Sequence, residues 1–189
     1  YIGFEPSMSV AKKAKKNNIN TLVEFFCYKN VSLLSKFKHN TDVIYAANCI
    51  CHIPDLTDLI KSVDLMLTSK GVFIFEEPYL GSMFDKVSYD QIYDEHIYMF
   101  SVSSIQKIFR KFDMELIDAY PQETHGGSMR YVVARKNQRK VNDSLKNIIK
   151  YEIDKDIDNI SSCLKFKKNC EFSKKKIVDL LNKRKKKNK

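Results

Sequence analysis

Glycine is scarce in this chain of 189 residues, which contains only Gly3, Gly71, Gly81, Gly126 and Gly127. None of these forms the glycine-rich turn that follows the first strand of a doubly wound nucleotide-binding sheet. The chain also begins with a tyrosine, inside a stretch that reads as a strand, rather than with methionine. We therefore expect the first strand and its glycine loop to lie upstream and to be missing here.

Long apolar runs, a signal peptide and paired cysteines are absent as well. No stretch reaches the roughly 18 apolar residues of a spanning helix, and the N-terminal "YIGFEPS" lacks the basic start and apolar run of a signal peptide. The five cysteines are odd in number and include no Cys-x-x-Cys pair typical of zinc or redox sites. We expect reduced thiols in a cytoplasmic protein, no metal ligands in this chain and no membrane partner.

Basic residues are in excess, with 33 Lys and Arg against 23 Asp and Glu and a net charge of +10. Much of the excess lies in the C-terminal "KKKIVDLLNKRKKKNK", and no basic motif with interleaved aromatics, as in RNA-binding proteins, occurs. Basic runs are usually solvated faces. We do not expect nucleic acid as a partner, although a non-catalytic module that binds nucleic acid through this tail is one alternative.

Apolar strands alternate with helices through much of the chain. "LTDLIKSVDLMLTSKG" has helical spacing and ends on Gly71, between the strand-like runs "TDVIYAANCICHI" and "VFIFEEP". Such an alternation predicts a parallel sheet that helices cover on both faces. Earlier, "YIGFEPS" and "TLVEFF" read as strands that flank the helical "MSVAKKAKKNN".

The strand pattern closes differently. "SVSSIQKIFRKF" reads as a serine-capped helix, and "MELIDAYPQ" and "SMRYVVARK" follow as two strands with no helix between them. This antiparallel addition is the usual end of a class I methyltransferase core. The sequence thus predicts an α/β, Rossmann-like doubly wound sheet over residues 1–136, incomplete at its N-terminus, and a charged helical extension over 137–189.

Acidic and small residues at strand ends mark a ligand edge, because ligands bind at the carboxyl ends of strands in open α/β sheets. Glu5 ends the first apolar run and can accept hydrogen bonds from both ribose hydroxyls of a nucleotide-like cofactor. A lone acid at this position is more often a plain strand terminus, but its context, "GFEPSMSVAKKA", favours the cofactor role. In "AANCICHIPD", Ala47 and Asn48 permit close approach of a cofactor, and His52 can reach a reacting centre. On position alone His52 is an ordinary loop histidine.

The segment "YDQIYDEHIYMFS" gathers tyrosines, acids and a histidine where no helix or strand needs them for packing. His96 follows Glu95 directly, and Tyr93 precedes it at a spacing that shares one face if the segment is helical. An imidazole can take a proton near neutral pH, and a tyrosine hydroxyl can donate to a developing oxyanion. We predict proton chemistry at this segment, with Tyr79 on the same ligand side.

The stretch "ETHGGSMRYVV" places paired glycines before a strand. Such pairs usually serve a turn, and they also permit close approach of the backbone to a ligand. Ser128 and Arg130 are then available for phosphate or sugar oxygens.

In this order the pieces resemble the S-adenosylmethionine-dependent C-methyltransferases of nucleotide-linked deoxysugars. The similar runs are "GFEPS", "DVIYAANCICHIPD" and "GVFIFEEPY", and the most specific are "YDEH" and the later "HGGSMR". The resemblance covers residues 1–136 and continues weakly beyond. It implies a central cofactor domain, an N-terminal zinc domain that is missing here, and a C-terminal substrate domain of which residues 137–189 are the helical start.

The resemblance also implies roles for individual residues. S-adenosylmethionine is the implied cofactor, and its expected contacts are Glu5, Pro6, Phe25, Phe26, Ala47 and Asn48. His96 is the implied base that removes the proton at sugar carbon 3, next to a 4-keto group, while Tyr93, Glu95 and His52 surround the enolate. The implied substrate contacts are Tyr79, His125, Gly126, Gly127, Ser128 and Arg130.

Two alternatives remain. A methyltransferase that acts on oxygen would not need a strong base for carbon, and a binding fragment would need no catalytic residues at all. Asp94 stands where the family often has His, and the glycine loop and most of the C-terminal domain are absent. We therefore expect that this chain alone can be inactive while its parent protein is an enzyme.

Overall fold

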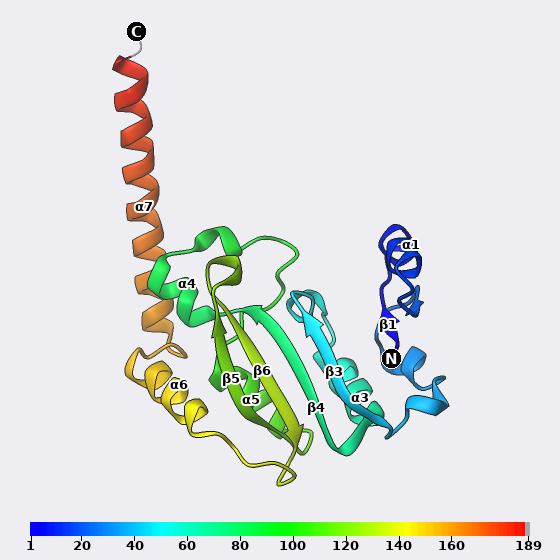
Figure 1. The fold of residues 1–189 in the computed structure, drawn as a ribbon. Coiled ribbons are helices and arrows are strands. Elements are labelled where there is room, and N and C mark those ends of the chain that lie inside the picture. The colour runs from blue at the N-terminus through cyan, green and yellow to red at the C-terminus, as the bar shows by residue number, and fades with distance from the viewer. Residues whose placement is uncertain (188–189) are drawn as a thin grey trace.

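The computed structural model describes residues 1–187 (Figure 1). In chain order its elements are β1 (Gly3–Phe4), α1 (Met8–Lys16), β2 (Thr21–Leu22), α2 (Tyr28–Val31), β3 (Thr41–Ala47), α3 (Leu56–Met66), β4 (Leu67–Pro78), α4 (Leu80–Lys86), α5 (Val102–Arg110), β5 (Met114–Gln122), β6 (Ser128–Arg135), α6 (Asp143–Asp154) and α7 (Ile160–Lys187), with short 3-10 turns at Ser35–Phe37, Ile50–His52, Tyr89–Gln91 and Thr124–Gly126.

The strands form one four-stranded sheet and one separate pair. The larger sheet has the order β3-β4-β6-β5, in which β3 and β4 are parallel and the two contacts of β6 are antiparallel. The parallel pair β1-β2 stands apart from it. The predicted antiparallel ending is therefore confirmed, and "TLVEFF" contributes only its first two residues, Thr21–Leu22, to a strand.

Two helix boundaries show how local chemistry sets these elements. Helix α5 starts at a reciprocal capping box, in which the Ser101 and Ser104 side chains each bond the other's backbone N–H, so the predicted serine cap is confirmed. The predicted stop of α3 at Gly71 is wrong, because α3 ends at Met66 and β4 begins at once. Gly71 lies inside β4, where a Cβ atom would come within 2.8 Å of the Thr41 carbonyl oxygen.

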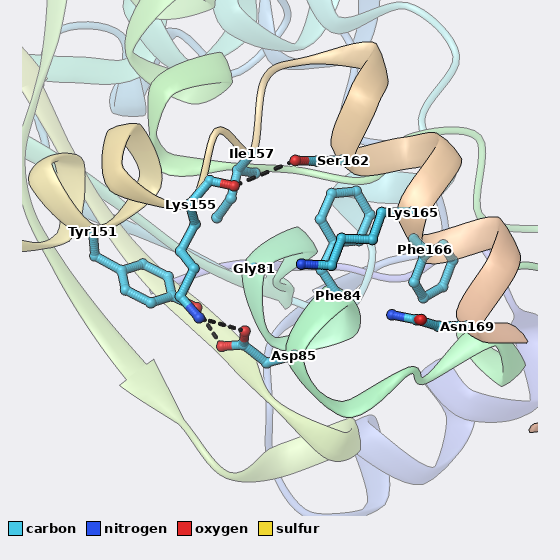
Figure 2. A pocket seen from close by; sticks show the side chains of 10 residues that line it. All are labelled: Gly81, Phe84, Asp85, Tyr151, Lys155, Ile157, Ser162, Lys165, Phe166 and Asn169. Atoms are coloured by element: carbon cyan, nitrogen blue, oxygen red, sulfur yellow. Dashed lines mark hydrogen bonds and ion pairs between the residues drawn. The ribbon is translucent and has the colours of Figure 1, made fainter.

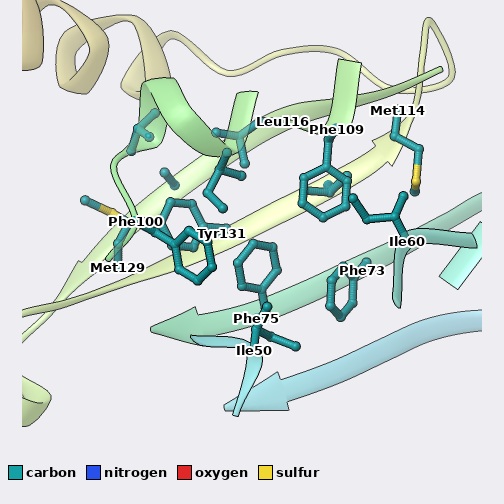
Figure 3. Packing of buried hydrophobic residues seen from close by; sticks show 14 of the residues in the cluster. Ile50, Ile60, Phe73, Phe75, Phe100, Phe109, Met114, Leu116, Met129 and Tyr131 are labelled. Atoms are coloured by element: carbon teal, nitrogen blue, oxygen red, sulfur yellow. The ribbon is translucent and has the colours of Figure 1, made fainter. Parts of the chain in front are cut away.

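The core lies between one face of the four-stranded sheet and helices α3 and α5 (Figure 3). Phe75 is fully buried there and stacks on Phe73 and Tyr131, with ring centroids 4.9 Å apart in each pair. On the opposite face of β3, Val43 and Tyr45 are exposed. The sheet is thus packed on one face, and the face to which Val43 and Tyr45 point is more open in the described chain.

The C-terminal helices differ from each other. Helix α6 packs on the core through Leu145 and Glu152, which are both buried. Helix α7 runs away from the body of the molecule (Figure 1) and exposes apolar side chains such as Phe172 and Leu181. Within residues 1–187, no helix combines the length and the apolar character that a membrane crossing requires. All five cysteines are free thiols.

Candidate active site

Tyr93 and His96 lie in the long connection between α4 and α5, at the carboxyl ends of β3 and β4. The backbone N–H groups of Ile97 and Tyr98 donate to the Cys51 carbonyl, which ties this connection to the loop after β3. A turn, closed by the His96 N–H on the Tyr93 carbonyl at 2.9 Å, brings the two side chains together. The expected pairing is thus present, although it arises from a turn and not from a helix.

His96 is held with a defined tautomer. Its Nδ1 lies 2.8 Å from the Gln91 carbonyl oxygen, which can only accept, so Nδ1 carries the hydrogen. In the neutral imidazole Nε2 then keeps its lone pair, and the Tyr93 hydroxyl donates to it at 2.7 Å. The ring is partly exposed. This arrangement makes His96 Nε2 a proton acceptor that a ligand can reach by displacing the Tyr93 hydroxyl.

His52 completes the same group. Its Nδ1 lies 2.6 Å from the backbone carbonyl oxygen of Glu95, and its ring centroid lies 5.1 Å from that of His96. The structure therefore brings His52, Tyr93 and His96 together, as predicted. Glu95 takes part through its backbone carbonyl, while its side chain is exposed.

Glu77 organises the loop that carries His52. Its Oε1 accepts from the backbone N–H groups of Cys49, at 2.9 Å, and Ile50, at 2.6 Å. The side chain is completely buried, and Oε2 has no hydrogen-bond partner among the residues that the structure describes. Burial and the adjacent Glu77 carboxylate raise the pKa of the Cys51 thiol well above its ordinary value. A buried carboxylate therefore holds this loop through two backbone N–H groups.

The hydroxyl of Tyr79, a predicted substrate contact, has a partner inside the protein. The side chain of Tyr79 is buried, its hydroxyl donates to Glu152 Oε1 at 2.9 Å, and the residue also lines a small hollow with His125. The same carboxylate accepts from the N–H groups of Val102 and Ser103 at the start of α5. Tyr79 is thus part of a buried network that joins β4, α5 and α6.

The Thr124–Gly126 turn and the strand after it lie beside the site. His125, Gly126 and Gly127 line a small hollow together with Gln91, whose carbonyl holds His96. Gly127 has a φ of 132°, and a Cβ there would meet the Ser82 side chain at 2.5 Å, so only glycine fits. His125 is exposed and free to contact a ligand.

The two residues of that strand that were predicted to contact substrate, Ser128 and Arg130, are already engaged. Arg130 Nη2 bonds Glu76 Oε2 at 2.9 Å, and the Thr124 hydroxyl donates to Glu76 Oε1 at 2.8 Å. Ser128 is buried and donates to the Thr124 carbonyl. A ligand can therefore reach Arg130, which is partly exposed, only beside its ion pair with Glu76.

The residues expected at the cofactor belong to two parts of the fold: some follow the strands of the β1-β2 pair, and the others follow β3 in the larger sheet. Glu5 Oε1 accepts from the Ser7 N–H at 2.8 Å, and Pro6 and Phe25 are exposed. Phe26 packs edge-on against Phe4, with ring centroids 5.1 Å apart. Of the expected contacts, Phe25 is thus open to a ligand, and Phe26 is held by its neighbour.

Ala47 and Asn48 lie opposite, at the exposed end of β3, and Asn48 has a positive φ of 53°. The next residue, Cys49, has a thiol whose pKa is raised to about 11, first by burial and then by the charges of Glu77 and Glu5.

Three residues of this region carry more than the sequence indicated. Glu76 and Glu77 lie near the end of β4, and both are buried hydrogen-bond acceptors. Two acids in the otherwise apolar "VFIFEEP" were a signal for this. Glu152 lies in a charged helix and nothing in the local sequence marks it as buried.

A separate pocket lies between α4, α6 and α7 (Figure 2). The rings of Phe84 and Phe166 stack there with centroids 5.1 Å apart, and Asp85 bonds both Tyr151 and Lys155. None of the predicted site residues lines this pocket.

Comparison with solved structures places the fold in one class. A solved S-adenosylmethionine-dependent methyltransferase of Anabaena variabilis matches with a TM-score of 0.53 and 17% identity, over 71% of this chain and 68% of that chain. The PH0226 protein of Pyrococcus horikoshii matches with a TM-score of 0.51 and 16% identity, over 71% of each chain. At these identities the likeness shows the fold alone, which is the α/β fold of class I methyltransferases, as predicted.

Sequence comparison identifies the family. Residues 1–119 match the family described as "Methyltransferase domain", and residues 123–189 match "C-methyltransferase C-terminal domain". The chain therefore belongs to the methyltransferase domain family. It is also similar to the C-methyltransferase NovU of Streptomyces niveus, with 26% identity over 128 residues, or 68% of this chain. The chain spans 30% of the length of that relative.

Proposed function

We propose that this chain is part of an enzyme that transfers a methyl group from S-adenosylmethionine to carbon 3 of a nucleotide-linked 4-keto deoxysugar. The observation that carries the proposal is the Tyr93–His96 pair, in which Nδ1 is fixed and Nε2 is available at the ligand edge. Carbon methylation requires such a base, because a C–H bond must be broken before carbon can act as a nucleophile. The matches to C-methyltransferase sequences support the same reaction class.

The proposed step starts when the sugar displaces the Tyr93 hydroxyl from His96. Nε2 then takes the proton from carbon 3, and the electron pair of the broken bond moves through the carbonyl to its oxygen. The freed Tyr93 hydroxyl is within the same group and donates to that oxygen, which lowers the energy of the enolate. His52 is held by the Glu95 carbonyl with its ring centroid 5.1 Å from that of His96, and we assign it to orienting the substrate.

The residues at the ends of β1 and β3 fit the cofactor. Glu5 uses one carboxylate oxygen for the Ser7 N–H, so the other is available for ribose hydroxyls, and Phe25 presents an exposed ring for the adenine. When bound, S-adenosylmethionine supplies the electrophilic methyl group. We place the glycine loop and a zinc domain upstream in the parent protein, and the sugar nucleotide against His125 and Arg130.

Methyl transfer with a labelled cofactor tests the proposal. The chain is incubated with S-adenosylmethionine labelled with ¹³C in its methyl group and a nucleoside diphosphate-linked 4-keto deoxysugar, and the product is followed by NMR. A carbon-bound methyl signal supports the proposal. An oxygen-bound methyl signal favours the alternative O-methyltransferase, and the absence of any labelled sugar contradicts activity of this chain.

A matched pair of histidine variants shows whether the site is responsible. His96→Gln removes the proposed base and should lower the transfer rate by about 10² to 10⁴-fold. His39→Asn changes an exposed histidine whose positive φ of 48° asparagine tolerates, and it should leave the rate unchanged.

A further inference from the structure

The loop after β3 and the connection before α5 bring a cysteine and two histidines to one point. One ligand atom of each of Cys51, His52 and His96 lies within 4.8 Å of the other two. A thiolate and neutral imidazoles are the donors that Zn²⁺ and related transition metals prefer over Mg²⁺ or Ca²⁺. The sequence predicted no metal ligands in this chain, because it contains no Cys-x-x-Cys pair.

The surroundings of the two imidazoles resemble those of metal ligands. In each ring Nδ1 donates to a backbone carbonyl, of Glu95 for His52 and of Gln91 for His96, so Nε2 is free of hydrogen in the neutral form. Metal-bound histidines usually donate their other nitrogen in this way, which fixes both the tautomer and the ring orientation. Two histidines held alike, beside one thiol, are therefore oriented for coordination.

The protein also supports the thiol of the group. Glu77 fixes the Cys49 and Ile50 N–H groups, and with them the loop that carries Cys51 and His52. The other oxygen of the Glu77 carboxylate, Oε2, is buried without a hydrogen-bond partner among residues 1–187.

We propose that Cys51, His52 and His96 form a binding site for Zn²⁺ or a similar transition metal, with a fourth position open to solvent. On binding, the thiol proton of Cys51 passes to solvent, and the metal takes the place of the Tyr93 hydroxyl at His96. Three protein ligands and one open position are the pattern of accessible zinc sites, whereas structural zinc sites are closed by four protein ligands. The site is separate from any zinc domain upstream, since all its ligands lie in this chain.

One consequence rests on the proposed function. Nε2 of His96 cannot bind a metal and accept a substrate proton at the same time, so Zn²⁺ should inhibit deprotonation of the sugar. Binding itself does not depend on that reaction, and the two claims can fail separately.

Titration of the chain with CoCl₂ tests the site, because Co²⁺ reports its ligands by optical absorption. The parent chain should show sulfur-to-cobalt charge-transfer absorption with the intense visible bands of tetrahedral Co²⁺, and ZnCl₂ should remove both. Cys51→Ser should lose the charge-transfer absorption, and Cys49→Ser, which alters a neighbouring thiol outside the group, should keep it. Absence of this absorption in the parent, or its survival in Cys51→Ser, would overturn the proposal.

A second variant covers the case in which the buried Cys51 cannot be replaced without loss of the fold. His52 is partly exposed, so His52→Ala should stay folded by circular dichroism. It should weaken Zn²⁺ binding in competition with Co²⁺ by about 100-fold or more, since even outer partners of metal ligands contribute roughly 10 to 100-fold. The control His39→Asn should bind as the parent does, and equal affinity of His52→Ala and the parent would contradict the site.

Discussion

The hydroxyls of Tyr79 and Tyr93 each bond a titratable side chain, and their surroundings give them different roles. Tyr79 is buried, and burial, followed by the charge of Glu152, raises its pKa well above the ordinary value. Tyr93 is 47% exposed and donates to the Nε2 atom of His96. The first hydroxyl cannot exchange its partner without disturbing the core, whereas the second can release His96 to a ligand.

The comparison also explains which pair the sequence could identify. Tyr93 and His96 are only three residues apart, so the short motif "YDEH" is enough to predict that their side chains lie close together. Tyr79 and Glu152 are 73 residues apart, and their bond depends on how α6 docks against the core. The sequence therefore pointed to the Tyr93–His96 pair, whereas the hydrogen bond between Tyr79 and Glu152 could be found only in the structure.

Removal of Glu152 should have the largest effect on stability. In Glu152→Ala the buried N–H groups of Val102 and Ser103 and the Tyr79 hydroxyl lose their acceptor. Each unpaired buried group costs about 1–3 kcal/mol, so we expect a loss of roughly 4 kcal/mol in the free energy of unfolding. Urea denaturation followed by circular dichroism measures it. Glu152→Gln, which keeps one carbonyl acceptor, should fall between, and a loss below about 1 kcal/mol in Glu152→Ala would refute this role.

Tyr93→Phe should separate chemistry from stability. Loss of the hydroxyl removes the donor for the enolate oxygen and should slow the reaction by roughly 10 to 100-fold. Because the side chain is half exposed, the free energy of unfolding should change by no more than about 0.5 kcal/mol. Rates from the labelled methyl assay and a urea titration of the same preparation provide both numbers. An unchanged rate would remove Tyr93 from the mechanism.

Asp118 supplies a pH-dependent link between β5 and the start of α6. Burial alone would raise the pKa of Asp118, but hydrogen bonds from Tyr120, Ser144 and Asn142 outweigh it and lower that pKa. A lowered folded pKa stabilises the fold above the unfolded value of about 3.9, and the gain is lost as the pH falls through the folded value.

Asp118→Asn should therefore cost about 2 kcal/mol at neutral pH, because hydrogen bonds to a charged group become neutral ones. The unmodified chain should lose this extra stability between neutral pH and pH values below about 4. The free energies of unfolding of the unmodified chain and of Asp118→Asn should therefore converge in acid. Urea titrations across that range compare the two proteins. A constant difference at every pH would show that the charge of Asp118 is not what stabilises the link.

Tyr79→Phe should destabilise the fold less than Glu152→Ala or Asp118→Asn. It removes one of the donors to Glu152 but leaves the buried ring and the α5 N–H groups in place. The expected loss is about 1 kcal/mol in the free energy of unfolding, measured by the same urea titration. A loss as large as that of Glu152→Ala would mean that Glu152 stabilises the fold mainly through the Tyr79 hydroxyl and not through the N–H groups at the start of α5.

Much of the fold was predictable because its causes are local. The capping serines of α5, the apolar run of β4 and the two closing strands are marked by short-range patterns. The end of α3 could not be predicted in this way. Leu67 pairs with Thr41 of β3, so β4 begins before Gly71 is reached. The roles of Glu77, Tyr79 and Glu152 were also hidden, since each depends on partners from distant segments that no periodicity reveals.

Exchange of the sugar's carbon-bound hydrogen tests the central claim, that His96 is the base, most directly. The chain is mixed in D₂O with a nucleoside diphosphate-linked 4-keto deoxysugar without cofactor, and the NMR signal of the hydrogen on carbon 3 is followed. The signal should disappear with the unmodified chain and with His39→Asn. With His96→Gln it should disappear about 10² to 10⁴-fold more slowly. Equal rates for the parent and His96→Gln, or no exchange with the parent, would contradict the account.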